Sequence, residues 1–263
     1  MPFLSVIIPA YNEIDNLNKG VLADADEYLK TKKYDWEVIV VDDGSVDGTA
    51  ENLNSWIKSH PGWRLVKNPH QGKAASVKTG VMKAAGDYVL FTDFDQATPL
   101  SEVEKLTPFI KKGYQIAIGS REVKGSERLD EPWYRHLMGK VFNFAVQIIA
   151  IGGIHDTQCG FKLFTNQAAK DLFNSLVVYG NGIEKQAYTG AFDVELLYIA
   201  QKRGLKIAEV PVLWRHVKTN RINPVRDSVR MFLDLIKIRL AALSGKYSRH
   251  WFVLPYPHAK LGL

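Results

Sequence analysis

The sequence predicts an α/β protein built around a doubly wound, mostly parallel sheet. Short apolar runs, typical of buried strands, alternate along the chain with segments of helical spacing. Polar, turn-rich loops follow several of these runs. Strands that alternate with helices at this spacing are typical of βαβ units, whose strands lie parallel in one sheet. The length of 263 residues fits one large domain of this class.

The apolar runs have the length of buried strands. They are Leu4–Pro9, Trp36–Val41, Trp63–Lys67, the run that begins at Asp87, Gln115–Gly119 and Ile207–Val212. Helices are expected between and after them, where caps and glycines punctuate the helical pattern. They run to about Lys32 after a cap at Asp15 or Asn16, from Thr49 to about Ser59, from Lys73 to Gly86, from Thr98 to about Lys112, over Met138–Ile151, from Gln167, from Phe192 and over Val225–Leu243.

The stretch from Asp87 to Leu100 combines a strand with two carboxylates. The expected strand ends in Asp93 and Asp95, one residue apart. A helix should follow at once, because Thr98 suits its N-cap and Pro99 its first position. One Asp could instead cap that helix while the other is solvated, but Thr98 already fills the capping role.

Two carboxylates at this spacing can hold a hard divalent cation, which often completes its shell with substrate phosphates. The loops 9–13 and 42–49 also carry carboxylates, and all three loops are expected to leave the carboxyl ends of adjacent strands, where α/β proteins usually bind ligands. Lys73, just before a helix N-terminus, adds a cation near the phosphates. The expected ligand is a nucleotide with a metal ion.

Two other nucleotide sites are excluded by their missing motifs. A dinucleotide site of the Rossmann type needs G-x-G-x-x-G after the first strand, where this chain has Pro-Ala-Tyr-Asn-Glu. A Walker loop is absent as well.

The net charge of +6 is concentrated near the C-terminus. The segment 202–263 carries 13 Lys and Arg against 3 Asp and Glu. A basic segment of this kind indicates an anionic partner, either a membrane or nucleic acid, or else a solvated face.

The helix expected over Val225–Leu243 is amphipathic. Its main apolar face is formed by Val225, Val229, Phe232, Leu233, Ile236, Leu240 and Leu243, with Leu235 and Ile238 outside it. Packing on the protein's own core and contact with lipid both fit this pattern, and they are compatible if one edge packs while the other touches lipid. The longest uncharged run, Val141–Ile154, is too short to span a membrane, which takes about 20 residues. The strand pattern begins at Leu4 with no basic region before it, so no signal peptide is expected.

Five strings in the chain, SVIIPAYNE, VVDDGSVDGT, DFDQ, GSR and DTQCGFKLF, resemble motifs of a known family. They are similar to those of the family 2 glycosyltransferases of GT-A fold, a Rossmann-like fold, and most of all to the polyprenyl-phosphate (dolichyl-phosphate) hexosyltransferases. DTQCGFKLF and FDVELL point to the dolichyl-phosphate glucosyltransferase branch, beside the mannose synthases. The resemblance covers about Leu4 to Gly245.

The resemblance implies roles for individual residues. The nucleotide would be held by Pro9, Tyr11, Glu13 and Asp42, with Asp43 beside them, and its base and diphosphate would be flanked by Gln71 and Lys73. The metal ion, Mg²⁺ or Mn²⁺, would be bound by Asp93 and Asp95. The phosphate groups of donor and acceptor would be bound by Arg121 and Arg135, and Asp156 would lie beside the acceptor. Lys162 is a further candidate cation for the phosphates. Where the mannosyl branch usually has Gln, this chain has Ala97, which leaves a third protein ligand of the metal in doubt.

The implied activity is inverting transfer of a hexose, with UDP-glucose as the expected donor and polyprenyl phosphate as the acceptor. GDP-mannose as donor, or a non-catalytic nucleotide-binding membrane scaffold, remain alternatives. A processive synthase is less expected, because the Q-x-x-R-W signature is missing after Gln201. We expect a domain over residues 1–220, extended over 221–263 by an amphipathic, basic segment that lies on the cytoplasmic face of a membrane. No nucleic-acid partner is expected.

Overall fold

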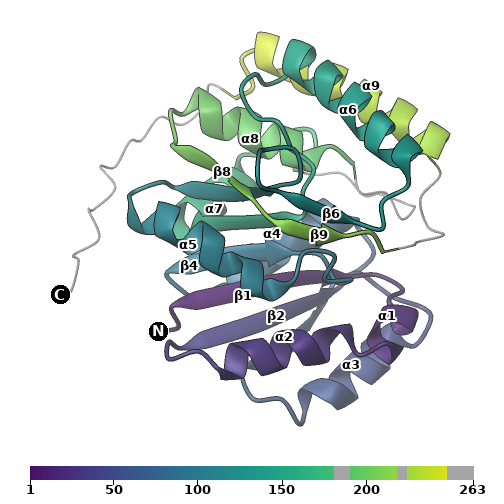
Figure 1. Cartoon of the computed structure of the whole chain (residues 1–263), viewed down its shortest axis with the longest axis vertical. Helices are drawn as coiled ribbons and strands as arrows, with labels where there is room; N and C mark the ends of the chain where they lie inside the picture. Colours follow the sequence, from purple (N-terminus) through teal and green to yellow (C-terminus); the bar gives the residue numbers. More distant parts are fainter. Residues whose placement is uncertain (181–189, 218–223, 248–263) are drawn as a thin grey trace.

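A twisted sheet lies at the centre of the computed structural model, which describes residues 1–180, 190–217 and 224–247 (Figure 1). Its strands within these ranges are β1 (Leu4–Ala10), β2 (Trp36–Asp42), β3 (Trp63–Lys67), β4 (Tyr88–Thr92), β5 (Ile116–Ser120), β7 (Phe161–Thr165) and β8 (Ile207–Pro211). They are arranged in the order β3-β2-β1-β4-β7-β5-β8. Strand β7 is antiparallel to both of its neighbours, and the other pairs are parallel, so the predicted mostly parallel sheet is confirmed.

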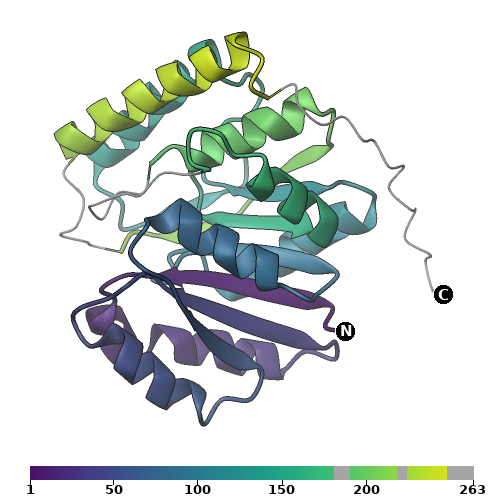
Figure 2. The same ribbon diagram turned by 180° about the vertical axis from the view of Figure 1, so that it is seen from behind.

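Helices cover both faces of the sheet (Figures 1 and 2). They are α1 (Ile14–Asn18), α2 (Val21–Lys30), α3 (Thr49–Ile57), α4 (Lys73–Lys83), α5 (Val103–Lys111), α6 (Trp133–Ile149), α7 (Asn166–Asn174), α8 (Phe192–Lys202) and α9 (Pro224–Leu243), with a 3₁₀ turn over Leu100–Glu102. Helices α2, α3 and α5 share one apolar cluster with the sheet, whereas α4, α7, α8 and α9 share another. A two-stranded parallel ribbon of β6 (Glu127–Leu129) and β9 (Leu213–Arg215) lies beside the main sheet.

Two local expectations about helix ends are wrong. The helix expected to run to Lys32 is broken at Gly20, whose φ of 74° ends α1 before α2 begins. Thr98 does not cap the helix after the Asp93 loop, because a 3₁₀ turn precedes α5 and neither has a side-chain cap. The Asp95 carboxylate instead accepts the Ala97 N–H at 3.1 Å, which closes the loop locally.

Helix α9 packs on the core by one edge only. Leu235 and Ile238 are fully buried, although both lie outside the main apolar face that the helical wheel predicts. That main face is exposed, as Phe232 and Leu240 illustrate. Helix α6 lies alongside α9 at the same end of the molecule (Figures 1 and 2). Within the described residues, no helix is both long and apolar enough to cross a membrane.

Gly80 shows how closely α4 approaches the sheet. A Cβ atom there would lie 2.3 Å from Cγ2 of Ile7 on β1 and 3.2 Å from Cγ2 of Val41 on β2. Gly80→Ala should therefore lower the free energy of unfolding by about 1–3 kcal/mol, because overpacking outweighs the better helix propensity of alanine. Urea denaturation measures this change.

Gly139→Ala is the matched control, because Gly139 also lies within a helix but has no atom within 4 Å of the added Cβ. It should leave stability unchanged or raise it by up to about 1 kcal/mol. Equal effects of the two substitutions would contradict the packing argument.

Candidate functional site

Three loops meet at the carboxyl edge of the sheet because β2, β1 and β4 are neighbours. The loops after β1 and β2 are joined by hydrogen bonds. Asn12 N–H donates to Ser45 Oγ at 2.9 Å, and Glu13 N–H donates to Thr49 Oγ1 at 2.8 Å. The adjacency predicted for these carboxylate-bearing loops is therefore present.

The first part of the site contains the residues expected to hold a nucleotide. Pro9 is buried in β1, and Tyr11 is half-buried just after that strand. Asp42 is buried at the end of β2, where its two carboxylate oxygens each lie 3.4 Å from the Ser45 N–H. Glu13 is nearly buried and accepts from the Asn16 side chain at 2.6 Å.

Asp43 shapes the neighbouring loop rather than facing an open space. Its buried carboxylate accepts the backbone N–H groups of Gln71 at 3.1 Å and Gly72 at 2.8 Å. The same carboxylate contacts the His70 ring at 2.8 Å, and that ring stacks on Tyr11 with centroids 4.2 Å apart. His70 is a site residue that the sequence alone did not single out, because a lone histidine in a loop carries no distinctive spacing.

Asp93 and Asp95 lie where β4 ends. Lys73, the first residue of α4, places its ammonium 2.6 Å from Oδ1 of Asp93. Gly160 leaves the space that the Asp93 carboxylate occupies, since a Cβ at Gly160 would lie 2.1 Å from Oδ2 of Asp93. The glycine in the DTQCGFKLF string is therefore required by a close approach, a reason that became visible only in three dimensions.

Among the residues that the structure describes, no Lys or Arg forms an ion pair with Asp95, whereas Asp93 has Lys73. Burial, and then the neighbouring Asp93 carboxylate, raise the pKa of the Asp95 carboxyl to about 6 against the opposing effects of the Ala97 N–H and Lys73. Two carboxylates this close together repel each other, and a bound cation relieves the repulsion. Their oxygen atoms are the ligand type that Mg²⁺ and Mn²⁺ prefer.

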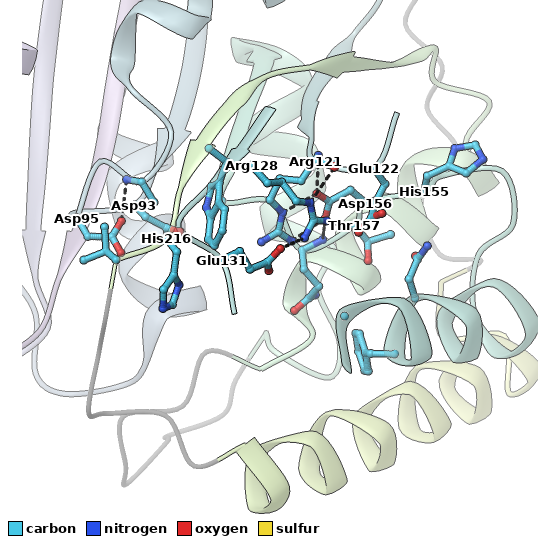
Figure 3. A pocket seen from close by; sticks show the side chains of 18 residues that line it. Asp93, Asp95, Arg121, Glu122, Arg128, Glu131, His155, Asp156, Thr157 and His216 are labelled. Atoms are coloured by element: carbon cyan, nitrogen blue, oxygen red, sulfur yellow. Dashed lines mark hydrogen bonds and ion pairs between the residues drawn. The ribbon is translucent and has the colours of Figure 1, made fainter. Parts of the chain in front are cut away.

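A cavity of about 290 Å³ extends from this pair (Figure 3). Asp93 and Asp95 lie at one end, and Arg121, Asp156 and Thr157 lie in the middle. Gly139, Phe142 and Asn143 of α6 also line it, together with Trp214 and His216. The cavity thus connects the carboxylates at the sheet edge to a helix with an exposed apolar face.

Arg121 and Asp156 form a buried bidentate pair in this cavity (Figure 3). The Arg121 side chain donates to Asp156 at 2.7 Å and 2.9 Å, and the Arg121 N–H adds a third bond at 2.9 Å. The N–H groups of Gln158 and Cys159 bond the same carboxylate. Burial would raise the pKa of Asp156, but the Arg121 charge and these hydrogen bonds hold it below its usual value. The guanidinium also lies 5.2 Å from the centroid of the Trp214 ring.

Other cations at or near the site have different surroundings. Arg128 lines the cavity, but its guanidinium contacts Glu122 and Glu131. Lys162 is buried in β7 and paired with Asp193 on α8, so the expectation that it reaches substrate phosphates is wrong in this structure. Arg135 belongs to α6, and its side chain lies outside the described residues.

Comparison with known proteins identifies related sequences over most of the chain. The model for glycosyl transferase family 2 matches residues 5–173. A dolichyl-phosphate beta-glucosyltransferase of Dictyostelium discoideum is 37% identical over 92% of this chain and 76% of its own length. The human protein of the same name is 36% identical over 93% of this chain and 77% of its own length.

Solved structures share the fold at lower identity. Glucosyl-3-phosphoglycerate synthase from Mycobacterium tuberculosis, in complex with Mn²⁺, UDP and glucosyl-3-phosphoglycerate, has a TM-score of 0.60 and 20% identity, covering 93% of this chain and 80% of its own. Mannosyl-3-phosphoglycerate synthase from Rubrobacter xylanophilus has a TM-score of 0.64 and 19% identity, covering 93% and 76%. The predicted GT-A class of fold is confirmed by these likenesses, and the chain belongs to glycosyl transferase family 2, among the relatives of the dolichyl-phosphate beta-glucosyltransferases.

Proposed function

We propose that the protein transfers glucose from UDP-glucose to a polyprenyl phosphate such as dolichyl phosphate, with inversion at the sugar. The cavity that runs from Asp93 and Asp95 to α6 carries this proposal. The part of the cavity beside Asp93 and Asp95, with a cation bound there, suits the diphosphate of a nucleotide sugar. The part beside the amphipathic helix α6 suits an acceptor whose lipid chain lies in a membrane. The names of the relatives at 36–37% identity support glucose as the sugar and dolichyl phosphate as the acceptor.

The two alternatives have weaker support. The relatives are named for glucosyl transfer, whereas a structural neighbour named for mannosyl transfer is 19% identical and speaks for the fold alone. A non-catalytic scaffold has no need for Asp93 and Asp95 at the wall of an open cavity, where both are present.

A divalent cation, Mg²⁺ or Mn²⁺, would be held by Asp93 and Asp95. When bound, it neutralises the diphosphate and stabilises it as a leaving group. The described residues contain no group of three or more His, Cys, Asp and Glu side chains placed to hold a metal. The remaining ligands would therefore be substrate phosphate and water, which fits the presence of Ala97 in place of glutamine.

The acceptor phosphate does not require a strong general base. Its second pKa is about 6, so it is largely a dianion at neutral pH and already nucleophilic. The Asp156 carboxylate is buried and accepts hydrogen bonds from Arg121, Gln158 and Cys159, which leaves it poorly placed to take a proton. We assign Asp156 the role of holding Arg121 against the cavity.

The charge of the cavity makes cations the limiting requirement. Five carboxylates belong to its described lining, those of Asp93, Asp95, Glu122, Glu131 and Asp156. Two guanidinium groups, those of Arg121 and Arg128, oppose them there. Two anionic substrates can meet there only if cations offset this excess. The metal, Arg121 and Arg135 are the cations proposed for this purpose.

Helices α6 and α9 together would face the membrane that contains the acceptor. We call their exposed apolar side chains the lipid-facing surface: Trp133, Tyr134, Leu137, Met138, Val141, Phe144 and Ile148 on α6, and Val229, Phe232, Leu233, Ile236, Leu240 and Leu243 on α9. Large exposed apolar patches mark protein or membrane contacts, and Trp and Tyr favour the level of the lipid headgroups. Lipid is the partner we infer, because α6 also lines the cavity.

The basic charge of the segment 202–263 indicates which membrane face the protein contacts. The cytoplasmic leaflet carries a negative surface potential that attracts Lys and Arg by about 1 kcal/mol for each residue near the surface. We therefore place the protein on that face as a peripheral protein.

Transfer should depend on a metal ion and on Asp95. With UDP-glucose, dolichyl phosphate and Mg²⁺ or Mn²⁺, the protein should form lipid-linked glucose, whereas GDP-mannose should give little product. EDTA should abolish transfer, and Asp95→Asn should lower kcat by at least about 100-fold, because the diphosphate then loses its counter-charge.

Asp87→Asn is the control, since Asp87 is exposed just before the opposite end of β4. It should retain full transfer. Full activity in EDTA would refute the metal assignment, and preferential formation of lipid-linked mannose would refute the donor.

The defect of Asp156→Asn should not depend on pH between 6 and 8. The pKa of Asp156 in the folded protein lies below its usual value. The charged carboxylate therefore contributes its full stabilisation at any pH above the unfolded pKa of about 3.9, and this stabilisation is lost only as pH falls from there through the lower folded pKa. Breaking the buried pair should cost about 3 kcal/mol of stability and lower turnover by a constant factor. A turnover defect that shrinks as pH rises from 6 to 8 would instead identify Asp156 as a proton acceptor.

Binding to anionic vesicles should weaken with added salt and with loss of the lipid-facing surface. Phe144→Glu, at a side chain that is 67% exposed, should weaken vesicle binding at low salt by at least about tenfold, because insertion then buries a charge in place of a ring. Val46→Glu is the control, since Val46 is 85% exposed but lies in the loop after β2. Equal cosedimentation of all three proteins would show that α6 does not contact lipid.

A further inference from the structure

A glutamate of β8 holds the loop that carries Asp156. The Glu209 carboxylate accepts the Asp156 N–H at 2.7 Å and the His155 N–H at 3.0 Å and 3.1 Å, one distance to each oxygen. It also lies 3.0 Å from Nδ1 of His155, which donates there because a carboxylate can only accept. The Glu209 side chain is 12% exposed. Three N–H groups of two consecutive residues therefore converge on one mostly buried carboxylate.

Asp156 is fixed from two neighbouring strands. Glu209 pairs with Ile118 in the register of β8 on β5, and Arg121 directly follows β5. Glu209 binds the backbone N–H of Asp156, whereas Arg121 binds its carboxylate. The position of the Asp156 carboxylate, and with it the contact to Arg121, is therefore set in part from β8.

The bond to Asp156 decides which edge of the Arg121 guanidinium is left for a substrate. It uses Nε and Nη2 of a planar group that has five N–H bonds, and the remaining N–H bonds can bind a phosphate group. The Trp214 ring lies 5.2 Å from the same planar group. Because the guanidinium is rigid, a shift of Asp156 changes the direction of its free edge.

A general tether for this loop would not have to act at Asp156. Two amide side chains already bind the loop closer to its start: Gln147 of α6 accepts the Gly153 N–H at 2.9 Å, and Gln201 of α8 donates to the Gly152 carbonyl at 2.9 Å. The glutamate of β8 binds the N–H of Asp156 itself, and N–H bonds to a carboxylate are stronger than those to an amide. Its placement points to a role in the Arg121 contact.

We propose that Glu209 is a positioning residue for glucosyl transfer, which holds the Asp156 backbone so that Arg121 presents its free N–H groups to the acceptor phosphate. The inference rests on the proposed function and adds a residue outside the cavity to it. Within the described residues, Arg121 and Asp156 line the cavity, whereas Glu209 does not (Figure 3). Glu209 therefore acts through Asp156 and not by touching a substrate.

Kinetics of transfer from UDP-glucose to dolichyl phosphate test this role in Glu209→Gln. An amide cannot accept all three N–H groups as the carboxylate does, so kcat/KM for dolichyl phosphate should fall by about tenfold. The Kd for UDP with Mn²⁺, measured by calorimetry, should change by less than about twofold. In the Asp156→Asn protein, Glu209→Gln should cost little further kcat/KM, because both substitutions act through Arg121.

A spectroscopic measurement follows Arg121 independently of activity. Its Nε–H donates to Asp156 at 2.7 Å, so it should give a resolved cross-peak in a ¹H–¹⁵N correlation spectrum, identified by its loss in Arg121→Lys. This cross-peak should shift or broaden in Glu209→Gln. Glu209→Asp keeps the charge but is one methylene shorter, so it should reproduce both effects if Glu209→Gln does not fold.

Glu37→Gln is the matched control. Glu37 is also a strand carboxylate, 16% exposed, that accepts the Ala85 N–H and pairs with Arg64, but it lies near the start of β2, at the opposite edge of the sheet from the site. Its substitution should lower the free energy of unfolding as Glu209→Gln does. It should leave kcat/KM for dolichyl phosphate and the Arg121 cross-peak unchanged.

Four results would overturn the positioning role: unchanged kcat/KM for dolichyl phosphate in Glu209→Gln, an equal loss in Glu37→Gln, an unchanged Arg121 cross-peak, or additive effects of Glu209→Gln and Asp156→Asn. If the unaltered protein transfers glucose to dolichyl phosphate, these results refute that role alone. If the unaltered protein forms no lipid-linked glucose, the proposed function fails, and the cross-peak alone then decides whether Glu209 sets the position of Arg121.

Discussion

Buried carboxylates are the constraint on which the site depends. A carboxylate removed from water must be satisfied by hydrogen bonds or by a cation. Asp43, Asp156 and Glu195 each meet this need with several backbone N–H groups, and each thereby fixes a loop. Asp93 and Asp95 are only partly buried, and they differ from these three: Asp93 takes an ammonium group, and Ala97 is the one N–H donor to Asp95 within the described residues. The two carboxylates lie together at the end of β4, where a divalent cation would complete them.

The parallel half of the fold could be predicted because the pattern of apolar runs and polar loops along the chain agrees there with the pairing of strands in the sheet. Each apolar run from Leu4 to Thr92 is followed by a polar loop, and β1, β2 and β4 became neighbours as expected. Strand β7 could not be found in the same way. Its residues follow Gly160 in a string that looked like a binding motif, and an antiparallel strand inserted between β4 and β5 leaves no mark in the order of elements along the chain.

Some residues of the candidate site could be predicted from the sequence, but their contacts could not. Sequence motifs indicated Asp93, Asp95, Arg121 and Asp156, and all four line one cavity. They did not indicate that Arg121 and Asp156 are bound to each other, because residues 35 positions apart pair only through tertiary structure. The helical wheel of α9 met the same limit. It finds the largest apolar face, but which face packs depends on where the core lies.

Helix α8 connects the two ends of the molecule that the reaction would need. In its first turn, Asp193 pairs with Lys162 and Glu195 accepts a hydrogen bond from the Tyr247 hydroxyl. Tyr247 follows α9 in the chain, and its side chain is buried in the core. Tyr179 adds a second tie, because its hydroxyl donates to Asp234 of α9 and accepts the Ala191 N–H just before α8. Residues in or just before the first turn of α8 thus contact Lys162, beside the carboxylate site, and, through Tyr179, Asp234 of α9. The packing of α8 therefore couples the position of the lipid-facing surface to that of the sheet edge.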